Sequence, residues 1–227
     1  MDSGVREYEK VIDSIMDQIQ SRRLKIGSIL PSERQMSSDL AISRNSVREG
    51  LRVLGNMGLV KSRQGSGNFI SADMSRSFIS VFNMMLMLRV ATLKEITDFR
   101  KGIEWTLYEL AFHNSDKADR LREMEGVLAC VPGSSAEDQI ALDYHFHLLL
   151  AAMANNAILS VIMNSVSSVY ETWIADVIHS ASPEERLKLH LTHAQIYDSL
   201  VSRNKEAGFA AVADHYDIVD AVAVRAL

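Results

Sequence analysis

The chain has 227 residues, of which 47% are hydrophobic and 23% are charged, a composition typical of a globular protein and not of a disordered or fibrous one. Its one cysteine, Cys130, cannot form an internal disulfide, and the N-terminal residues lack the apolar segment of a signal peptide. The most apolar early stretch, residues 78–91, is interrupted by polar side chains and is too short to span a bilayer. We therefore expect a cytoplasmic protein with no membrane partner.

The net charge of −5 is distributed unevenly along the chain. Residues 1–72 contain 11 Lys and Arg against 8 Asp and Glu, whereas residues 73–227 contain 13 against 21. A locally basic segment attracts phosphate even when the whole chain is acidic. The asymmetry is compatible with nucleic-acid binding by the N-terminal part, although it is not specific for that function.

The first 72 residues show the pattern of a winged helix-turn-helix. Ser32 and Ser43 each stand where an N-cap begins a helix, and Gly58 stands where the helix after Ser43 should end. Apolar spacing and turn residues predict helices over 5–22, 33–40 and 44–57, and short strands over 59–63 and 68–71.

The rest of the chain shows no strand pattern, and helix-capping sequences recur in it. Thr92, Ser134 and Ser182 each begin a capping-box pattern, with Glu three residues later. We therefore predict a mainly α-helical protein in which residues 75–227 form an antiparallel helical bundle. Its helices are expected at residues 75–90, 92–113, 116–130, 135–154, 157–180, 184–202 and 205–225.

The third predicted helix has the features of a DNA-recognition helix. Arg44 and Arg48 are four residues apart and share a face, while Val47 belongs to the apolar stripe. Arginine can donate two hydrogen bonds to one guanine, and the first residues of a recognition helix reach base edges. Arg34 would reach flanking phosphates, and the small hairpin tip at residues 65–67 would approach the DNA backbone. Arginines that only solvate an exposed helix face are the alternative.

Four sequence blocks resemble the GntR family of transcription regulators: Leu30-Pro31-Ser32-Glu33-Arg34, Ser43-Arg44-Asn45-Ser46-Val47-Arg48-Glu49, Gly58-Leu59-Val60 and Gly65-Ser66-Gly67. The resemblance implies a homodimer that binds a short palindromic operator in double-stranded DNA. The residues that it implies for DNA contact are Arg34, Arg44, Asn45, Ser46, Arg48, Gly65, Ser66 and Gly67. For Ser32 and Ser43, helix capping alone is a sufficient explanation, and a contact with DNA is an equally open alternative. Ala41 departs from the family, where glycine is frequent.

The helical part contains candidate metal ligands. Asp143 and His147 lie four residues apart on one predicted helix, and His193 and His215 lie midway along two others. One Asp and three His that converge in a bundle suit a divalent transition metal. Spacing alone also allows a surface pair and ordinary hydrogen-bonded histidines, and His190, one turn earlier, is an alternative to His193.

Residues 75–225 resemble the FCD ligand-binding domain of the FadR subfamily. The matching segments are Phe99 to Glu104, Asp143 to His147 with Asn156 following, His193 to Ile196 and Ala211 to His215. The resemblance implies that Asp143, His147, His193 and His215 hold a metal, for which we expect zinc, with nickel or manganese as alternatives. Four protein ligands leave open positions on an octahedral metal, where a carboxylate and a neighbouring hydroxyl could bind, so we expect a small organic acid as effector.

Two residues are candidates for contact with the effector. Arg100 would clamp a carboxylate, with a salt bridge to Glu104 as the alternative, and Asn156 would touch the ligand or, as we favour, cap a helix. His145 is expected to be an interior polar residue near the metal. The methionine-rich run at 84–88 is expected to pack in the core or in a dimer interface.

Two other functional classes remain as alternatives. A metal-dependent enzyme is less expected because the sequence lacks the H-E-x-x-H motif, a nucleophile elbow and a phosphate-binding glycine loop. An effector-free DNA-binding protein would use its bundle only for dimerisation. The sequence indicates neither repression nor activation.

Overall fold

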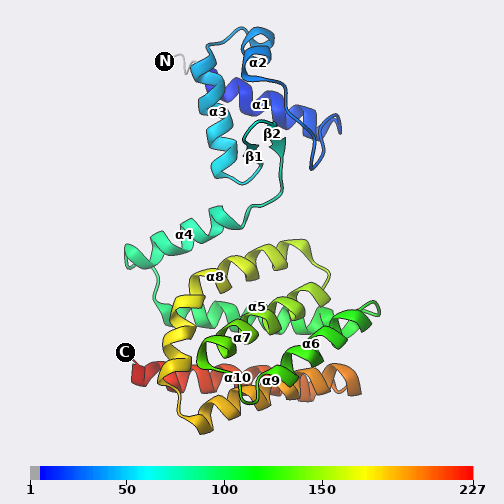
Figure 1. Cartoon of the computed structure of the whole chain (residues 1–227), viewed down its shortest axis with the longest axis vertical. Helices are drawn as coiled ribbons and strands as arrows, with labels where there is room; N and C mark the ends of the chain where they lie inside the picture. The colour runs from blue at the N-terminus through cyan, green and yellow to red at the C-terminus, as the bar shows by residue number, and fades with distance from the viewer. Residues whose placement is uncertain (1–5, 227) are drawn as a thin grey trace. The chain divides into compact units, whose positions relative to one another are not determined.

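The computed structural model describes residues 6–226 and divides into two compact units that meet between Phe78 and Ile79. The fold is mainly α-helical, as predicted, with one two-stranded sheet in the first unit (Figure 1). Among the described residues, no helix combines the length and the apolar character that a membrane span requires.

The first unit is a winged helix-turn-helix. Side chains of Ser32 and Ser43 accept hydrogen bonds from the backbone N–H of Gln35 and Ser46, which confirms both predicted N-caps. The predicted first helix included Val5, which lies outside the described residues. The elements of the first unit are α1 (Glu7–Gln20), α2 (Glu33–Leu40), α3 (Arg44–Asn56), β1 (Val60–Arg63) and β2 (Gly67–Ile70).

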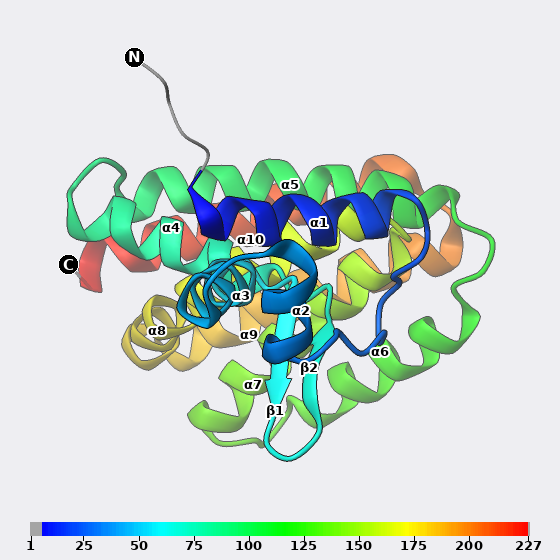
Figure 2. The ribbon, with the colours of Figure 1, turned by 90° about the horizontal axis from the view of Figure 1, so that it is seen from above.

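The core of this unit lies between α1 and α3. Val11 and Val47 are fully buried there, and a Cβ added at Gly50 would lie 2.8 Å from the Cβ of Val11. The absence of a side chain at Gly50 therefore lets the two helices approach closely. Strands β1 and β2 pair antiparallel, from Val60 opposite Ile70 to Arg63 opposite Gly67, and their loop extends away from the three helices (Figure 2).

Left-handed residues end the two helices of the helix-turn-helix. Gly58 follows α3 with φ +78°, and the N–H of Leu59 donates to the Leu54 carbonyl at 2.9 Å, as in a Schellman motif. A Cβ at Gly58 would lie 1.8 Å from the Asp73 carbonyl oxygen, so the predicted glycine cap is also required sterically. Ala41 ends α2 with φ 50° and ψ 46°, a conformation that favours glycine.

The second unit is a helical bundle, and the boundary between the two units falls within α4. Thr92 and Ser182 form the predicted capping boxes with Glu95 and Glu185. The helices are α4 (Ser75–Met87), α5 (Leu93–His113), α6 (Ala118–Cys130), α7 (Ala136–Met153), α8 (Ala157–Ser180), α9 (Pro183–Ser202) and α10 (Lys205–Ala226).

The capping box predicted at Ser134 is wrong by one residue. Ser135 is the N-cap of α7 and accepts a hydrogen bond from the Asp138 N–H. Ser134 instead closes the preceding turn, because both its N–H and its hydroxyl donate to the carbonyl of Val131.

Helices α9 and α10 pack side by side in opposite directions (Figure 1), and α10 also packs against α5. The crossing of α5 and α10 is close, because a Cβ added at Gly208 would lie 1.9 Å from the Tyr108 hydroxyl oxygen. Apolar side chains of six helices, α5 to α10, fill the interior around this crossing, and they include Leu107, Phe146 and Leu150. The bundle thereby fixes the inner faces of α5, α7, α9 and α10 relative to one another.

Helix α4 has an apolar sequence but no buried residue. Within the run at 84–88, Met84, Met87 and Leu88 are 59%, 83% and 67% exposed. The prediction that this run packs in the core is therefore wrong for these three residues. The helix also ends three residues before its predicted end, because Arg89 takes a left-handed conformation with φ 55°.

Candidate metal centre and DNA-binding surface

Four candidate ligands converge inside the second unit. Helix α7 places Asp143 and His147 one turn apart on one face, α9 contributes His193 and α10 contributes His215. One ligand atom from each residue lies within 4.8 Å of the others, and the three imidazoles are buried. The structure thus brings together all four residues predicted from the sequence.

The spacing of these atoms suits a metal ion. Oδ1 of Asp143 lies 3.6 Å from Nε2 of His147 and 3.6 Å from Nε2 of His193. Ligand atoms about 2.0–2.1 Å from a common zinc ion would lie roughly 3–3.5 Å apart at neighbouring positions. The His193 and His215 rings stack with centroids 4.4 Å apart, and a ligand atom of each lies within 4.8 Å of the other ligand atoms.

Unpartnered nitrogens support the same fit. Nε2 of His147 and Nε2 of His193 are buried and make no hydrogen bond within the described part of the chain. Such groups are costly to bury unless something satisfies them. On the other side of two rings, Nδ1 of His147 lies 2.8 Å from Oε2 of Glu104 without the geometry of a hydrogen bond, and Nδ1 of His215 lies 3.2 Å from the Thr192 hydroxyl. Nε2 of His147 thereby faces Oδ1 of Asp143.

Glu104 is the residue that sequence reasoning missed in this role. It is fully buried on α5, and its Oε2 accepts a hydrogen bond of 2.8 Å from the Tyr216 hydroxyl as well as contacting His147. The sequence connected Glu104 with Arg100, one turn earlier, and not with His147. A signal was present, since a carboxylate among Ile103 and Leu107 on the apolar face of a helix requires a buried partner.

For three of the four candidate ligands, the surroundings set protonation states that suit metal binding. Burial alone would lower the pKa of His147, but the charges of Glu104 and Asp143 outweigh it and raise that pKa, so a metal would displace a proton from this ring. Burial alone would raise the pKa of Asp143, but the charges of His147, His193 and Arg100 outweigh it and hold that pKa well below its usual range. Burial lowers the pKa of His215 to about 3, and burial together with the charge of His215 lowers the pKa of His193. An ionised carboxylate and neutral imidazoles are the forms that coordinate a metal.

The remaining predicted residues of this unit have different positions. Arg100 is buried, and its charge lowers the pKa values of both Asp143 and Glu104. Asn156 caps α8, because its Oδ1 accepts a hydrogen bond of 3.1 Å from the Leu159 N–H; this confirms the favoured interpretation.

Two other histidines of the sequence analysis lie outside the cluster. His145 is exposed and contacts Glu123 at 3.1 Å, so its expected interior position is wrong; residue 145 is two positions from His147 and lies on the other side of α7. His190 also lies outside the ligand cluster, to which α9 contributes His193.

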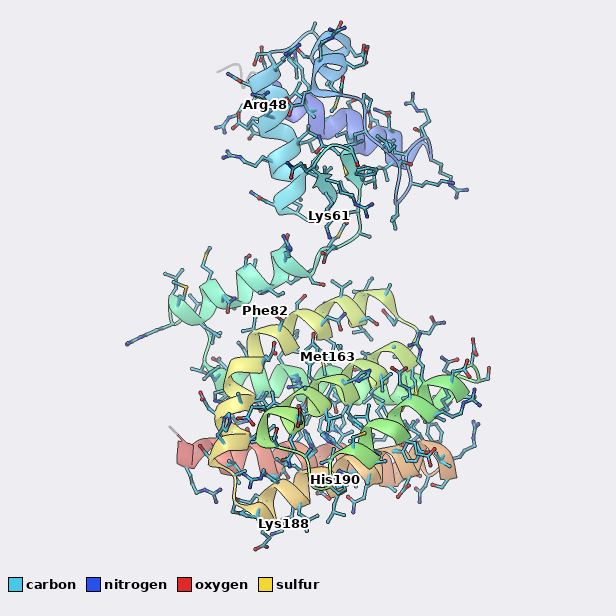
Figure 3. The ribbon with its side chains drawn as sticks, viewed as in Figure 1. Arg48, Lys61, Phe82, Met163, Lys188 and His190 are labelled. Carbon is cyan, nitrogen blue, oxygen red and sulfur yellow. The ribbon has the colours of Figure 1, made fainter. Side chains whose placement is uncertain are left out.

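In the first unit, the side chains predicted to contact DNA lie on the surface. Arg34, Arg44 and Asn45 are exposed, and so is the hairpin tip at residues 65–67. Arg48 is 63% exposed, and its Nε donates to Oε2 of Glu33 at 2.7 Å (Figure 3).

The hydroxyl of Ser46 is already engaged within the protein. It donates to Oε2 of Glu7 at 2.6 Å and lies 2.8 Å from the hydroxyl of Ser43. These bonds connect the start of α3 to α1 and give Ser46 a structural role beside its predicted contact with DNA.

Sequence reasoning did not select two further basic residues on this surface. Arg52 is exposed four residues after Arg48, and therefore on the face of α3 that carries Arg44 and Arg48. Lys61 is exposed on β1 (Figure 3). Extending the four-residue spacing from Arg44 and Arg48 by one step would have identified Arg52.

Comparison with known families matches both units. The family model described as "Bacterial regulatory proteins, gntR family" matches residues 7–70, and the FCD domain model matches residues 95–218. The protein belongs to the GntR family of transcription regulators and carries an FCD domain. All four candidate metal ligands of this GntR regulator lie within the FCD match.

Relatives match over most of this GntR regulator. The HTH-type transcriptional regulator LutR of Bacillus subtilis (strain 168) is 27% identical, with 90% of this chain and 95% of LutR covered. The Glc operon transcriptional activator of Escherichia coli (strain K12) is 26% identical, with 91% and 85% covered. A solved structure of Streptococcus agalactiae GntR, 22% identical, has a TM-score of 0.68 over 93% of this chain and 98% of that chain, and it shares the fold. These relatives are regulators, which excludes the enzyme alternative.

Proposed function

We propose that this GntR regulator controls its operator affinity through a small organic acid that binds at a divalent metal centre in the FCD domain. The observation that carries the proposal is the buried cluster of Asp143, His147, His193 and His215, in which ring nitrogens lack protein partners. A regulator that binds chromosomal DNA acts in the cytoplasm, the compartment of the metabolites that it would sense.

The four residues of the cluster would hold the metal, and zinc is the ion we expect, with nickel or manganese as alternatives. A bound divalent ion supplies open coordination positions that attract a carboxylate and a neighbouring hydroxyl. Glu104 and Thr192 would keep His147 and His215 oriented toward it.

An acid is the effector that the surrounding charges favour. Arg100 is buried beside the cluster, where its charge acts on Asp143, and a guanidinium at that position suits a carboxylate. Asn156 is a weaker candidate for contact because its Oδ1 already caps α8. In the zinc-loaded protein, titration calorimetry with a panel of 2-hydroxy acids should detect binding that a chelator abolishes. Binding that survives metal removal would contradict the metal-centred site.

In the first unit, Arg44, Asn45, Ser46 and Arg48 would enter the major groove. Arg34 would contact phosphates, and the wing tip at Gly65, Ser66 and Gly67 would approach the backbone. Arg44→Ala and Arg48→Ala should each weaken operator binding by about 1–3 kcal/mol, measured by fluorescence anisotropy at fixed salt. Arg122→Ala, at an exposed arginine of α6, is the matched control. Unchanged affinity for both variants would contradict this assignment.

The operator and the acid would bind at two different sites of one protein, so their binding equilibria are thermodynamically linked. An acid changes operator affinity only to the extent that it binds more tightly to one arrangement of the DNA-binding units than to another. Saturating acid should therefore shift operator affinity by roughly 5–150-fold, and operator DNA should shift acid affinity by the same factor. An acid that binds without any shift would favour the effector-free alternative.

A homodimer on a palindromic operator fits the exposed apolar surface of α4. Val81, Met84, Met87 and Leu88 are exposed there, and residues 77–88 carry no charge. Large exposed apolar surfaces mark interaction sites. Two copies joined through this surface would present two recognition helices to two half-sites.

A further inference from the structure

The three histidines of the metal-ligand cluster differ in what lies behind each ring. Nδ1 of His147 lies 2.8 Å from Oε2 of Glu104, and Nδ1 of His215 lies 3.2 Å from the Thr192 hydroxyl. The ring of His193 stacks on an aromatic side chain, with centroids 4.2 Å apart. Of these three contacts, the one at His147 is with a charged group.

Glu104 lies outside the ligand cluster itself. His147 stands between two carboxylates, because Oε2 of Glu104 is 2.8 Å from its Nδ1 and Oδ1 of Asp143 is 3.6 Å from its Nε2. The two nitrogens of an imidazole point away from each other, and Glu104 is not one of the four residues whose ligand atoms lie within 4.8 Å of one another. Glu104 would therefore contact the back of a ligand ring and not the metal.

The carboxylate of Glu104 is fixed in place by its own partner. The side chain is fully buried on α5, and its Oε2 accepts a hydrogen bond of 2.8 Å from the hydroxyl of Tyr216. Tyr216 directly follows the ligand His215 on α10, so one helix supplies both a ligand and the group that holds the carboxylate. A buried carboxylate is costly to maintain without such partners, and its position behind a ligand ring gives it a function that would offset the cost.

We propose that Glu104 is a positioning residue that raises the metal affinity of the centre through His147. The inference rests on the proposed function, which places a divalent ion among the four ligands. A carboxylate behind a metal-bound histidine fixes the ring and makes it a stronger ligand. Its charge also attracts a divalent ion about twice as strongly as it attracts a proton on the same ring nitrogen, so Glu104 favours the metal over the proton that the metal displaces.

The zinc affinity of full-length variants tests the inference. Glu104→Gln keeps the size of the side chain and removes its charge, and it should weaken zinc binding roughly 10–100-fold in competition with a fluorescent chelator. Thr192→Val removes the neutral contact behind His215 and should weaken zinc binding less, by about threefold. Glu123→Gln is the matched control and should change nothing, because Glu123 contacts His145 at 3.1 Å on the surface, outside the cluster.

A spectroscopic measurement separates positioning of a ligand from support of the fold. Cobalt(II) bound in place of zinc absorbs visible light at wavelengths that depend on the strength and arrangement of its ligands. Glu104→Gln should therefore shift the cobalt bands, whereas Glu123→Gln should leave them unchanged. If Glu104 supported only the fold, Glu104→Gln would destabilise the metal-free protein but would keep the native zinc affinity and cobalt spectrum, and that result would overturn the inference.

Tyr216→Phe tests the same connection without altering the carboxylate. It removes the hydrogen bond to Oε2 of Glu104 and should weaken zinc binding roughly three- to tenfold, so it provides the test even if Glu104→Gln does not fold. Native zinc affinity in either variant would overturn the role of Glu104 and leave the four-ligand centre standing. Failure of the native protein to bind zinc, nickel or manganese would instead overturn the metal centre itself.

Discussion

The two candidate sites of this protein differ in how they are built. The DNA-binding surface consists of exposed side chains on one helix and one hairpin, and Arg48 is 63% exposed. The metal centre consists of side chains from three helices, and the His147 side chain is 0% exposed. The first site needs only one correctly capped helix, whereas the second exists only when the bundle has packed.

Because of this difference, we expect substitutions at the metal centre to change both stability and function, and substitutions on the DNA-binding surface to change function alone. An exposed arginine contributes little to folding, so its substitution should affect DNA binding alone. A buried imidazole that binds a metal contributes to both, because a metal that binds only the folded state stabilises it. The predictions below test that separation, from the largest expected effect to the smallest.

The largest effect should follow removal of a metal ligand. At a zinc concentration about a thousandfold above its Kd, zinc should stabilise the native protein by about 4 kcal/mol, and His147→Ala should lose most of that gain. Urea unfolding with zinc and with a chelator measures the difference. Arg44→Ala should change the free energy of unfolding by less than about 0.5 kcal/mol under the same conditions.

His145→Ala is the matched control for the metal ligand. It changes the same residue type two positions away on α7, but at an exposed site that contacts Glu123. The variant should retain the full zinc-dependent stabilisation. If zinc stabilised His147→Ala as strongly as the native protein, the cluster would not be the metal site, and the contrast between the two regions would disappear.

A second large effect should follow a charge placed on the exposed surface of α4. Met87→Lys should weaken self-association roughly 30-fold, because an unpaired ammonium would be buried in an apolar interface. Sedimentation equilibrium measures the dimer constant. Ile158→Lys, at an equally apolar residue that is 73% exposed on α8, is the control. Unchanged association in Met87→Lys, or a loss in both variants, would show that α4 is not the dimer surface.

A smaller effect should follow release of Arg48 from its ion pair. Glu33→Gln removes the acceptor of the 2.7 Å bond and should strengthen operator binding about two- to fivefold, since exposed ion pairs are weak and DNA must displace this one. Glu49→Gln removes an exposed carboxylate next to Arg48 without releasing a bond, and it controls for reduced phosphate repulsion. Weaker binding in Glu33→Gln would instead show that the ion pair holds Arg48 in position for the DNA.

Local sequence signals predicted most of the fold. The caps at Ser32, Ser43 and Ser182 and the stop at Gly58 are short-range features, and the structure confirms each of them. The error at Ser134 shows the limit of such signals. Ser134 and Ser135 are adjacent and chemically alike, and the preceding turn, which no pattern identifies, decides which of them caps α7.

The candidate site was predictable to the extent that a family resemblance supplied long-range contacts. Spacing on α7 pairs Asp143 with His147, but nothing local brings in His193 or His215 or excludes His190. The role of Glu104 was missed for the same reason: its partners His147 and Tyr216 are on other helices. Contacts between helices are set by packing, which a single sequence does not display.

The smallest predicted effect concerns Ala41, which differs from the residue frequent in the family. Its left-handed backbone costs energy for any side chain with a Cβ, so Ala41→Gly should stabilise the protein by about 0.5–1 kcal/mol in urea unfolding. Ser38→Gly, inside the same helix, should instead destabilise it by about 1 kcal/mol or less. Glycine adopts the same left-handed conformation, so the helices that carry Arg34 and Arg44 should keep their positions. Operator affinity should therefore stay unchanged. A change in affinity with Ala41→Gly would mean that the turn geometry itself tunes DNA binding, and that the separation of stability from function in this region is incomplete.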